Sequence, residues 1–276
     1  MSWSPELEPY IRLGSFLSIF VVMALWEAFA PCRQLITKRR SRWLNNVGLV
    51  VVDTLLLRVV APAGAVGMAW FADARGWGLL QLVAWPFWVK VLVAVVILDF
   101  IIYLQHVMFH AVPALWRLHM VHHADIDFDV TTGIRFHPVE ILLSMVIKAA
   151  AITALGPPAV AVLIFEVVLN GTATFNHANV SLPSGLDRAL RWIVVTPDMH
   201  RVHHSIVIDE SNSNFGFNLP WWDRLMGTYI AQPAAGQQGM TIGLTHVREK
   251  RQTLLWMLAL PFRGKPGDYP LGHEDE

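Results

Sequence analysis

Long apolar stretches separated by short polar segments dominate the chain. Residues 14–30, 47–71 and 87–112 are each about as long as a membrane-crossing helix requires, roughly 20 residues. A fourth stretch, 139–175, is too long for one crossing and carries a Gly-Pro-Pro triplet at 156–158. Because proline ends helices and restricts the residue before it, we expect the triplet to divide this stretch into two spans. The pattern therefore predicts an all-α integral-membrane bundle of about five spans.

The charges around the first span predict its orientation. Glu6 and Glu8 precede the span, whereas a cleaved signal peptide begins with positive charge, so we expect a retained anchor. The loop that follows, 33–42, holds five basic residues and no acidic one, which is typical of a cytoplasmic loop. Five crossings counted from this loop place every histidine-rich segment on the cytoplasmic side. We expect those segments to form a cytosolic helical cap on a multi-pass protein.

Composition agrees with a membrane protein. Of the 276 residues, 54% are hydrophobic and only 15% are charged. The net charge is zero and the basic residues form no long stripe, so no nucleic-acid partner is expected. A single cysteine, Cys32, excludes an internal disulfide framework and a cysteine-built metal site. We expect one domain over 1–276, with anchor spans in 1–90 and a polar, mobile tail at 263–276.

Three short motifs hold eight of the twelve histidines. One is HxxxH and two are HxxHH, so helical periodicity brings the histidines of each motif to one helix face. Eight imidazoles are too many for one ion, so two metal ions are the economical number. Imidazole binds iron, zinc, copper and nickel alike, and the ligand type therefore leaves redox and hydrolytic chemistry open. The candidate ligands are His106, His110, His119, His122, His123, His200, His203 and His204.

Several other polar residues accompany these motifs. His177 continues a polar face of the fifth span, and His137 lies where the fourth span begins, so both are further candidate ligands, His137 provisionally. We interpret His246 and His273 as ordinary surface residues. Nearby carboxylates are candidates for holding imidazole N–H groups in position. These are Asp99, Asp125, Glu140 and Asp198.

Two expectations concern the rest of the membrane domain. Lys148 and Glu166 lie nine residues before and nine residues after Pro157, so they should sit at similar depth and form an ion pair across the hairpin. Trp221, Trp222 and the short apolar stretch 253–262 are expected to rest the C-terminal part on the membrane interface.

The order of the three motifs and the residues around them resemble a known family. The flanking segments are "DFIIYLQHVMFH", "LWRLHMVHH", "RFHPVE", "FNHANV" and "NFGFNLPWWDRLMGTY". Over residues 95–230 the chain is similar to the fatty acid hydroxylase and sterol desaturase superfamily of integral-membrane di-iron oxygenases. The resemblance implies that the eight motif histidines bind two iron ions. His177 and, provisionally, His137 match further histidines of the family.

The same resemblance implies an activity. Dioxygen would serve as co-substrate to hydroxylate or desaturate a C–H bond of a lipid, a sterol, fatty acyl chain or related apolar molecule, that enters from the bilayer. The sequence contains no recognisable haem, flavin or nucleotide-binding motif, so a separate ferredoxin- or cytochrome-type protein is expected to donate electrons. A membrane zinc hydrolase, a bis-histidine haem electron-transfer protein and a metal transporter are the alternatives. No motif identifies the lipid.

Overall fold

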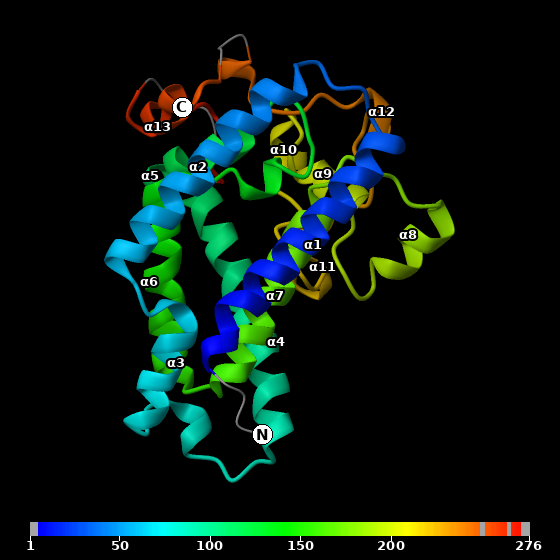
Figure 1. The fold of residues 1–276 in the computed structure, drawn as a ribbon. Coiled ribbons are helices and arrows are strands. Elements are labelled where there is room, and N and C mark those ends of the chain that lie inside the picture. The colour runs from blue at the N-terminus through cyan, green and yellow to red at the C-terminus, as the bar shows by residue number, and fades with distance from the viewer. Residues whose placement is uncertain (1–4, 249–251, 264–265, 272–276) are drawn as a thin grey trace.

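The computed structural model describes residues 5–248, 252–263 and 266–271, and helices are its only regular elements within those ranges. Five helical segments are long and apolar enough to cross a membrane, which confirms the expected bundle. Figure 1 shows them running side by side, with the shorter helices gathered toward the end of the bundle where the chain also ends. The crossing segments are α1 (Glu8–Phe29), α2 with α3 (Arg39–Val60 and Gly64–Ala74), α4 (Phe87–Ala111), α6 (Pro138–Leu155) and α7 (Ala159–Asn176).

Proline and glycine divide the spans where the sequence indicates. Helix α2 ends at Val60 because Pro62 follows, and the second crossing then continues as α3. Helix α6 ends at Leu155, and the next residue, Gly156, adopts the left-handed conformation (φ 62°) that favours glycine after a helix end. A side-chain carbon added at Gly78 would lie 2.1 Å from the Gly156 nitrogen, so the backbones at these two turns touch. The predicted hairpin of α6 and α7 is confirmed.

Shorter helices form the cap, which we define as α5 and α8 to α13 with their connecting loops. Helix α5 follows α4 after a single residue, and the other six follow α7 in the chain. Their bounds are α5 (Pro113–His123), α8 (Ser184–Leu190), α9 (Pro197–His203), α10 (Ile208–Ser211), α11 (Trp221–Leu225), α12 (Gly236–Gly239) and α13 (Leu254–Ala259). Single 3-10 turns occur at η1 (Pro5–Leu7), η2 (Leu79–Gln81), η3 (Thr132–Ile134), η4 (Thr245–Val247) and η5 (Leu260–Phe262).

The expected ion pair across the hairpin is present. Lys148 Nζ of α6 lies 3.2 Å from Glu166 Oε1 of α7. A second basic residue, Arg12 of α1, lies 3.1 Å from the other carboxylate oxygen of Glu166 and also pairs with Glu8. Opposite charges are thereby balanced inside the apolar part of three spans, where an unpaired charge would be costly.

The expectation of a mobile tail is wrong for the part of it that the structure describes. Tyr269 is buried, stacks on Trp116 of α5 and donates a hydrogen bond from its hydroxyl to the Ile206 carbonyl. Leu271 N donates to the carbonyl of His110. An aromatic residue able to fill a gap beside α5 holds residues 266–271 in place, although polar residues flank it. His246 is exposed, as expected, and His273 lies outside the described residues.

The aromatic and apolar segments expected at the membrane interface have protein partners as well. The Trp222 indole donates to Asp99 of α4, and the Trp221 indole donates to the Trp192 carbonyl. Helix α13 packs through Met257 into the core around Trp116, while Leu255 remains exposed. Contact with a membrane interface stays a prediction for this region.

Candidate metal centre

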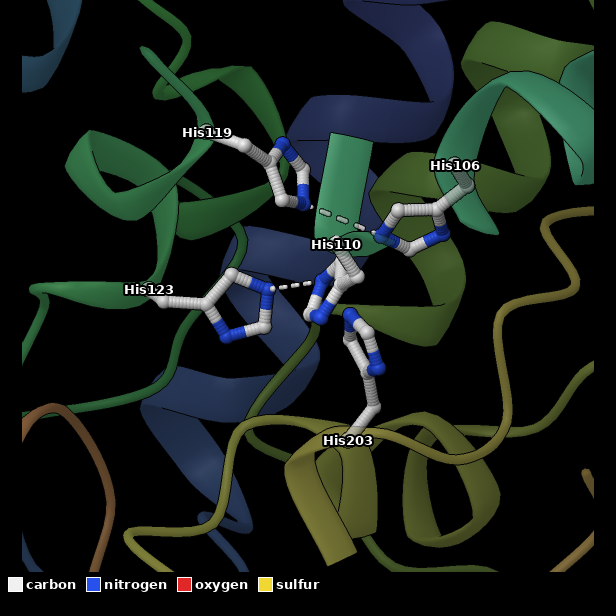
Figure 2. Close-up of side chains that lie close together, drawn as sticks. All are labelled: His106, His110, His119, His123 and His203. Carbon is white, nitrogen blue, oxygen red and sulfur yellow. Dashed lines mark hydrogen bonds between the residues drawn. The ribbon is translucent and has the colours of Figure 1, made fainter. Parts of the chain in front are cut away.

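Nine histidines from four parts of the chain converge in two adjacent groups. We name them the five-histidine group and the four-histidine group, and within each group one ring nitrogen per residue lies within 4.8 Å of the others. Figure 2 shows the first group, with rings from α4, α5 and α9 turned toward a common centre. The five-histidine group is His106, His110, His119, His123 and His203, and the four-histidine group is His122, His177, His200 and His204.

Each HxxHH motif is shared between the two groups. His119 and His123 join the five-histidine group, whereas His122 joins the other. In the third motif the division is reversed, because His200 and His204 join the four-histidine group and His203 the five-histidine group. Positions i and i+4 thus serve one group and position i+3 the other. The sequence predicted one face per motif, but not that each HxxHH motif would contribute rings to both groups.

Local sequence features place the helices that carry these rings. Pro113 occupies the first turn of α5, where its missing N–H costs nothing, and the helix therefore begins directly after α4. Helix α9 likewise begins with Pro197, and the Thr196 hydroxyl accepts a hydrogen bond from Met199 N to cap it. His177 lies where α7 ends. All nine rings are therefore carried by helices or by helix ends.

Backbone carbonyls and one side-chain amide oxygen on the outer side of the rings orient five of the nine histidines. In each of these, Nδ1 faces an oxygen that can only accept, so Nδ1 carries the proton and a neutral ring keeps its lone pair on Nε2. The Asn212 amide oxygen is one of these acceptors, because its nitrogen donates to the Tyr269 carbonyl. The pairs are His106 with Phe215 O (2.7 Å), His203 with Ser213 O (2.7 Å), His177 with Ala173 O (2.8 Å), His110 with Asn212 Oδ1 (3.0 Å) and His122 with Arg135 O (3.3 Å).

Burial keeps the rings neutral. All nine are at most 3% exposed. Loss of hydration lowers the pKa of His119 and of His177 to about 3, and it lowers the pKa of His200, His203 and His204 well below the usual range, with the neighbouring imidazoles adding to the effect. These side chains are therefore in the protonation state that binds metal ions.

The inner side of the rings fits metal ions. Nε2 of His106 lies 3.0 Å from Nε2 of His119, and Nε2 of His200 lies 3.0 Å from Nε2 of His177. Lone pairs that face each other at this distance repel unless a proton or a cation lies between them. His203 Nε2 and both ring nitrogens of His204 are buried without a hydrogen-bond partner. Convergent, deprotonated and unpartnered nitrogens are the donor set that a divalent transition metal requires.

Of the four candidate carboxylates, Glu140 contacts a ring. Its Oε1 lies 2.7 Å from His119 Nδ1, so a helix α6 carboxylate holds one ring of the five-histidine group. The other three bind different donors in the described structure and form no hydrogen bond with an imidazole. Asp99 accepts from Trp222 Nε1 (2.7 Å), Asp125 pairs with Arg42 (2.7 Å), and Asp198 pairs with Arg201 (2.6 Å).

His137 belongs to neither group. Its Nδ1 accepts a hydrogen bond from Val139 N and thereby caps α6, and its Nε2 faces the Leu258 carbonyl at 3.2 Å. Both nitrogens of this ring have protein partners, in contrast to the inward-facing nitrogens of the two groups. The structure thus shows His137 fastening α6 to the C-terminal part of the chain.

A cavity of about 270 Å³ adjoins one group only. It lies between α2, α4, α6 and α7, and His106 and His119 form part of its wall. Glu140, Ser144 and Lys148 line it at intervals of four residues on α6, so it extends about 12 Å along that helix. No residue of the four-histidine group lines it. Among its lining residues, Thr54 of α2 is exposed, which places one edge of the cavity at the flank of the bundle.

Sequence reasoning did not find several residues of this site. Asn212 and the carbonyls of Phe215 and Ser213 orient rings through backbone geometry that has no sequence signal. Asp53 of α2, which lines the cavity, did carry a signal, because an ionisable residue inside an apolar span is rare. Arg42 was interpreted only as a topology marker, yet it is buried between Asp125 and Asp129.

Comparison with known proteins extends the sequence evidence. The chain is 29% identical to the ornithine lipid hydroxylase OlsE of Rhizobium tropici over 91% of its own length and 75% of that protein. It is 30% identical to the alkylglycerol monooxygenase of Xenopus tropicalis, covering 59% of this chain but only 33% of that protein. A very-long-chain aldehyde decarbonylase of Oryza sativa subsp. indica is also 30% identical, over 53% of this chain and 24% of the plant protein. No solved structure matches.

The family match covers the residues that build the site. The fatty acid hydroxylase family model matches residues 91–228, half of the chain, which include all nine converging histidines and Glu140. Several relatives are named as lipid hydroxylases or monooxygenases, so the match supports an oxidoreductase in the membrane. The residues outside the match are chiefly α1 to α3 and the C-terminal segment that packs on α5. The chain belongs to the fatty acid hydroxylase family.

Proposed function

We propose that this protein is a membrane-bound, di-iron lipid hydroxylase that uses dioxygen. The observation that carries the proposal is the division of nine neutral imidazoles into two adjacent groups, each able to hold one ion, with one group in the wall of a cavity inside the membrane domain. Two sites side by side, built only from nitrogen ligands, suit a pair of redox-active ions better than one hydrolytic zinc, which needs three ligands and an open position.

The protein groups have separate tasks in this proposal. The five-histidine group and the four-histidine group would each hold one iron, with Glu140 keeping His119 in its binding orientation. Bound iron would supply the activation of dioxygen. The cavity would hold the lipid with its reacting carbon near His106 and His119, and burial of all nine rings keeps bulk water from the centre.

The reaction needs electrons from outside the chain. Hydroxylation breaks one C–H bond and places one oxygen atom of dioxygen in the product. The other oxygen atom takes up two electrons and two protons and leaves as water. A separate ferredoxin- or cytochrome-type protein would supply the electrons at the cap. We further propose that the cap faces the cytoplasm, because the basic loop between α1 and α2 lies at the same end of the bundle as the cap.

Isotope labelling of the product tests this proposal. Lipids extracted from cells with and without the gene are compared by mass spectrometry, with growth under ¹⁸O₂ as the labelled arm. The expected product is heavier by one oxygen atom that derives from dioxygen. A lipid that loses two hydrogens would indicate desaturation in place of hydroxylation. A lipid change that persists without dioxygen, with zinc as the bound metal, would contradict the proposal.

A further inference from the structure

Two buried hydrogen-bond acceptors without a donor line the cavity beside the five-histidine group. Asp53 Oδ1 and Gln105 Oε1 are buried, line the cavity, and have no hydrogen-bond donor among the described residues. Asp53 is 7% exposed and lies in α2, well inside an apolar span. A buried acceptor without a donor costs free energy, and a carboxylate costs more than an amide. A carboxylate kept at such a place indicates that something else in the cavity partners it.

The charges around the cavity do not supply that partner. Lys148 is paired with Glu166, which also binds Arg12, and Arg12 in turn binds Glu8, so these two basic and two acidic groups balance. No basic side chain of the described chain forms an ion pair with Asp53. The second carboxyl group of the cavity, Glu140, contacts His119 through Oε1, and its buried Oε2 has no hydrogen-bond partner among the described residues. The cavity therefore holds two carboxyl groups, Asp53 and Glu140, and among the described residues no basic side chain pairs with Asp53.

The acceptors also lie beside the metal centre. Gln105 precedes His106 in α4, and its amide nitrogen donates to the Ser144 hydroxyl, which leaves its oxygen without a donor. Ser144 is one helical turn from Glu140, whose Oε1 contacts His119 Nδ1. A ligand group that Asp53 and Gln105 bind would therefore occupy the cavity that the five-histidine group borders.

We propose that Asp53 is a specificity-determining residue that binds an ammonium group of the lipid substrate. An ammonium offers three N–H donors, so it can donate to more than one acceptor of the cavity wall, and its charge stabilises an ionised carboxylate. A hydroxyl group is uncharged, so it could donate to one acceptor but would not stabilise the ionised form of Asp53. The inference rests on the proposed function in one respect, namely that the molecule in this cavity is the substrate. It narrows the substrate to lipids that carry a primary amine.

Binding to the full-length protein in phosphatidylcholine nanodiscs tests the inference. The probes are hexadecylamine, its N-acetyl derivative and hexadecanol, and the dissociation constants are measured at pH 7 without dioxygen. We expect wild-type protein to bind the amine at least about tenfold more tightly than either neutral probe. Asp53→Asn should abolish that preference, whereas Asp53→Glu, which keeps the charge, should retain most of it.

Asp73→Asn is the matched control. It makes the same change in the same crossing segment, at an exposed residue of α3 that bonds to Gln81, and it should bind all three probes as the wild type does. Equal melting temperature and metal content show that Asp53→Asn is folded. If that variant does not fold, the affinities of the wild-type protein for the amine and for its N-acetyl derivative still show whether the protein prefers an amine.

The inference is overturned if wild-type protein does not prefer the amine, or if Asp53→Asn keeps the preference. Neither result depends on oxidation. An amine preference in a protein that oxidises no lipid would contradict the proposed function and retain only the amine-binding role of Asp53. Oxidation of lipids by a protein that shows no amine preference would support the proposed function and overturn the inference.

Discussion

The two histidine groups share the two HxxHH motifs but face different surroundings. Two rings of the five-histidine group border the cavity, and a carboxylate side chain, Glu140, holds one of them. The four-histidine group borders no part of that cavity, and backbone carbonyls orient two of its rings. Under the proposed function this difference would divide two tasks within one centre: the five-histidine group would adjoin the substrate, and the four-histidine group would hold the second ion.

Removing a ligand from either group should have the largest effect. His203→Ala and His200→Ala each delete an inward-facing ring, so each should lower activity at least about 100-fold and reduce the iron content by about one ion per chain. Iron is quantified by elemental analysis of purified protein. His246→Ala, which removes an exposed histidine outside both groups, should leave iron and activity unchanged. Two irons retained in His200→Ala would show that the division into groups is wrong.

The next effect should be confined to the five-histidine group. Glu140→Gln weakens the acceptor of His119 Nδ1, so affinity for one of two metal ions should fall roughly 10- to 100-fold while the other is kept. Competition with a chelator, followed by elemental analysis, measures the two affinities. Asp209→Asn, at an exposed carboxylate of α10, is the control. Equal weakening of both sites would mean that Glu140 does not distinguish the groups.

Filling the cavity with a larger side chain should lower the activity and leave the iron content unchanged. Ser144→Phe places a ring in the cavity wall of α6, so we expect activity to fall by about tenfold, with a higher KM and normal iron content. Val146→Phe makes the same helix bulkier at a side chain that is 65% exposed, and it should have little effect. Unchanged kinetics of Ser144→Phe would argue that the lipid binds elsewhere.

The smallest expected effect concerns the metal-free protein at lower pH. Folding lowers the pKa of His119 and of His177 to about 3, from about 6.5 in an unfolded chain. Below about pH 6.5 the unfolded state therefore takes up protons that the folded state does not, so stability is lost as the pH falls. The melting temperature of metal-free protein should drop between pH 7.5 and pH 5.5. Protein loaded with metal at pH 7.5 should melt higher, and an apo protein insensitive to this pH change would contradict the account.

The sequence predicted those features that depend on local periodicity. Apolar length and the Gly-Pro-Pro triplet were enough for the five crossings and the hairpin of α6 and α7, and residue spacing was enough for the Lys148–Glu166 pair. The histidine spacing correctly indicated converging rings, including His177. These predictions succeed because helix geometry translates sequence separation directly into direction and depth.

Long-range partners were beyond sequence reasoning. Which ring of each HxxHH motif turns to which group depends on how α4, α5, α7 and α9 pack, and no spacing reports that. For the same reason the sequence could not distinguish Glu140 from the other three candidate carboxylates. In the fold, Asp99 accepts a hydrogen bond from Trp222 of α11, Asp125 pairs with Arg42, and Asp198 pairs with Arg201. Tyr269 shows the converse, because one buried aromatic residue packs on Trp116 and holds residues 266–271 against the cap, although polar residues flank it.

Anomalous diffraction at the iron absorption edge tests the central claim most directly. Crystals of the iron-loaded protein should give two peaks of comparable height, one inside the five-histidine group and one inside the four-histidine group, with His137 distant from both. A single peak, or a second peak outside His122, His177, His200 and His204, would contradict the paired centre that the fold indicates.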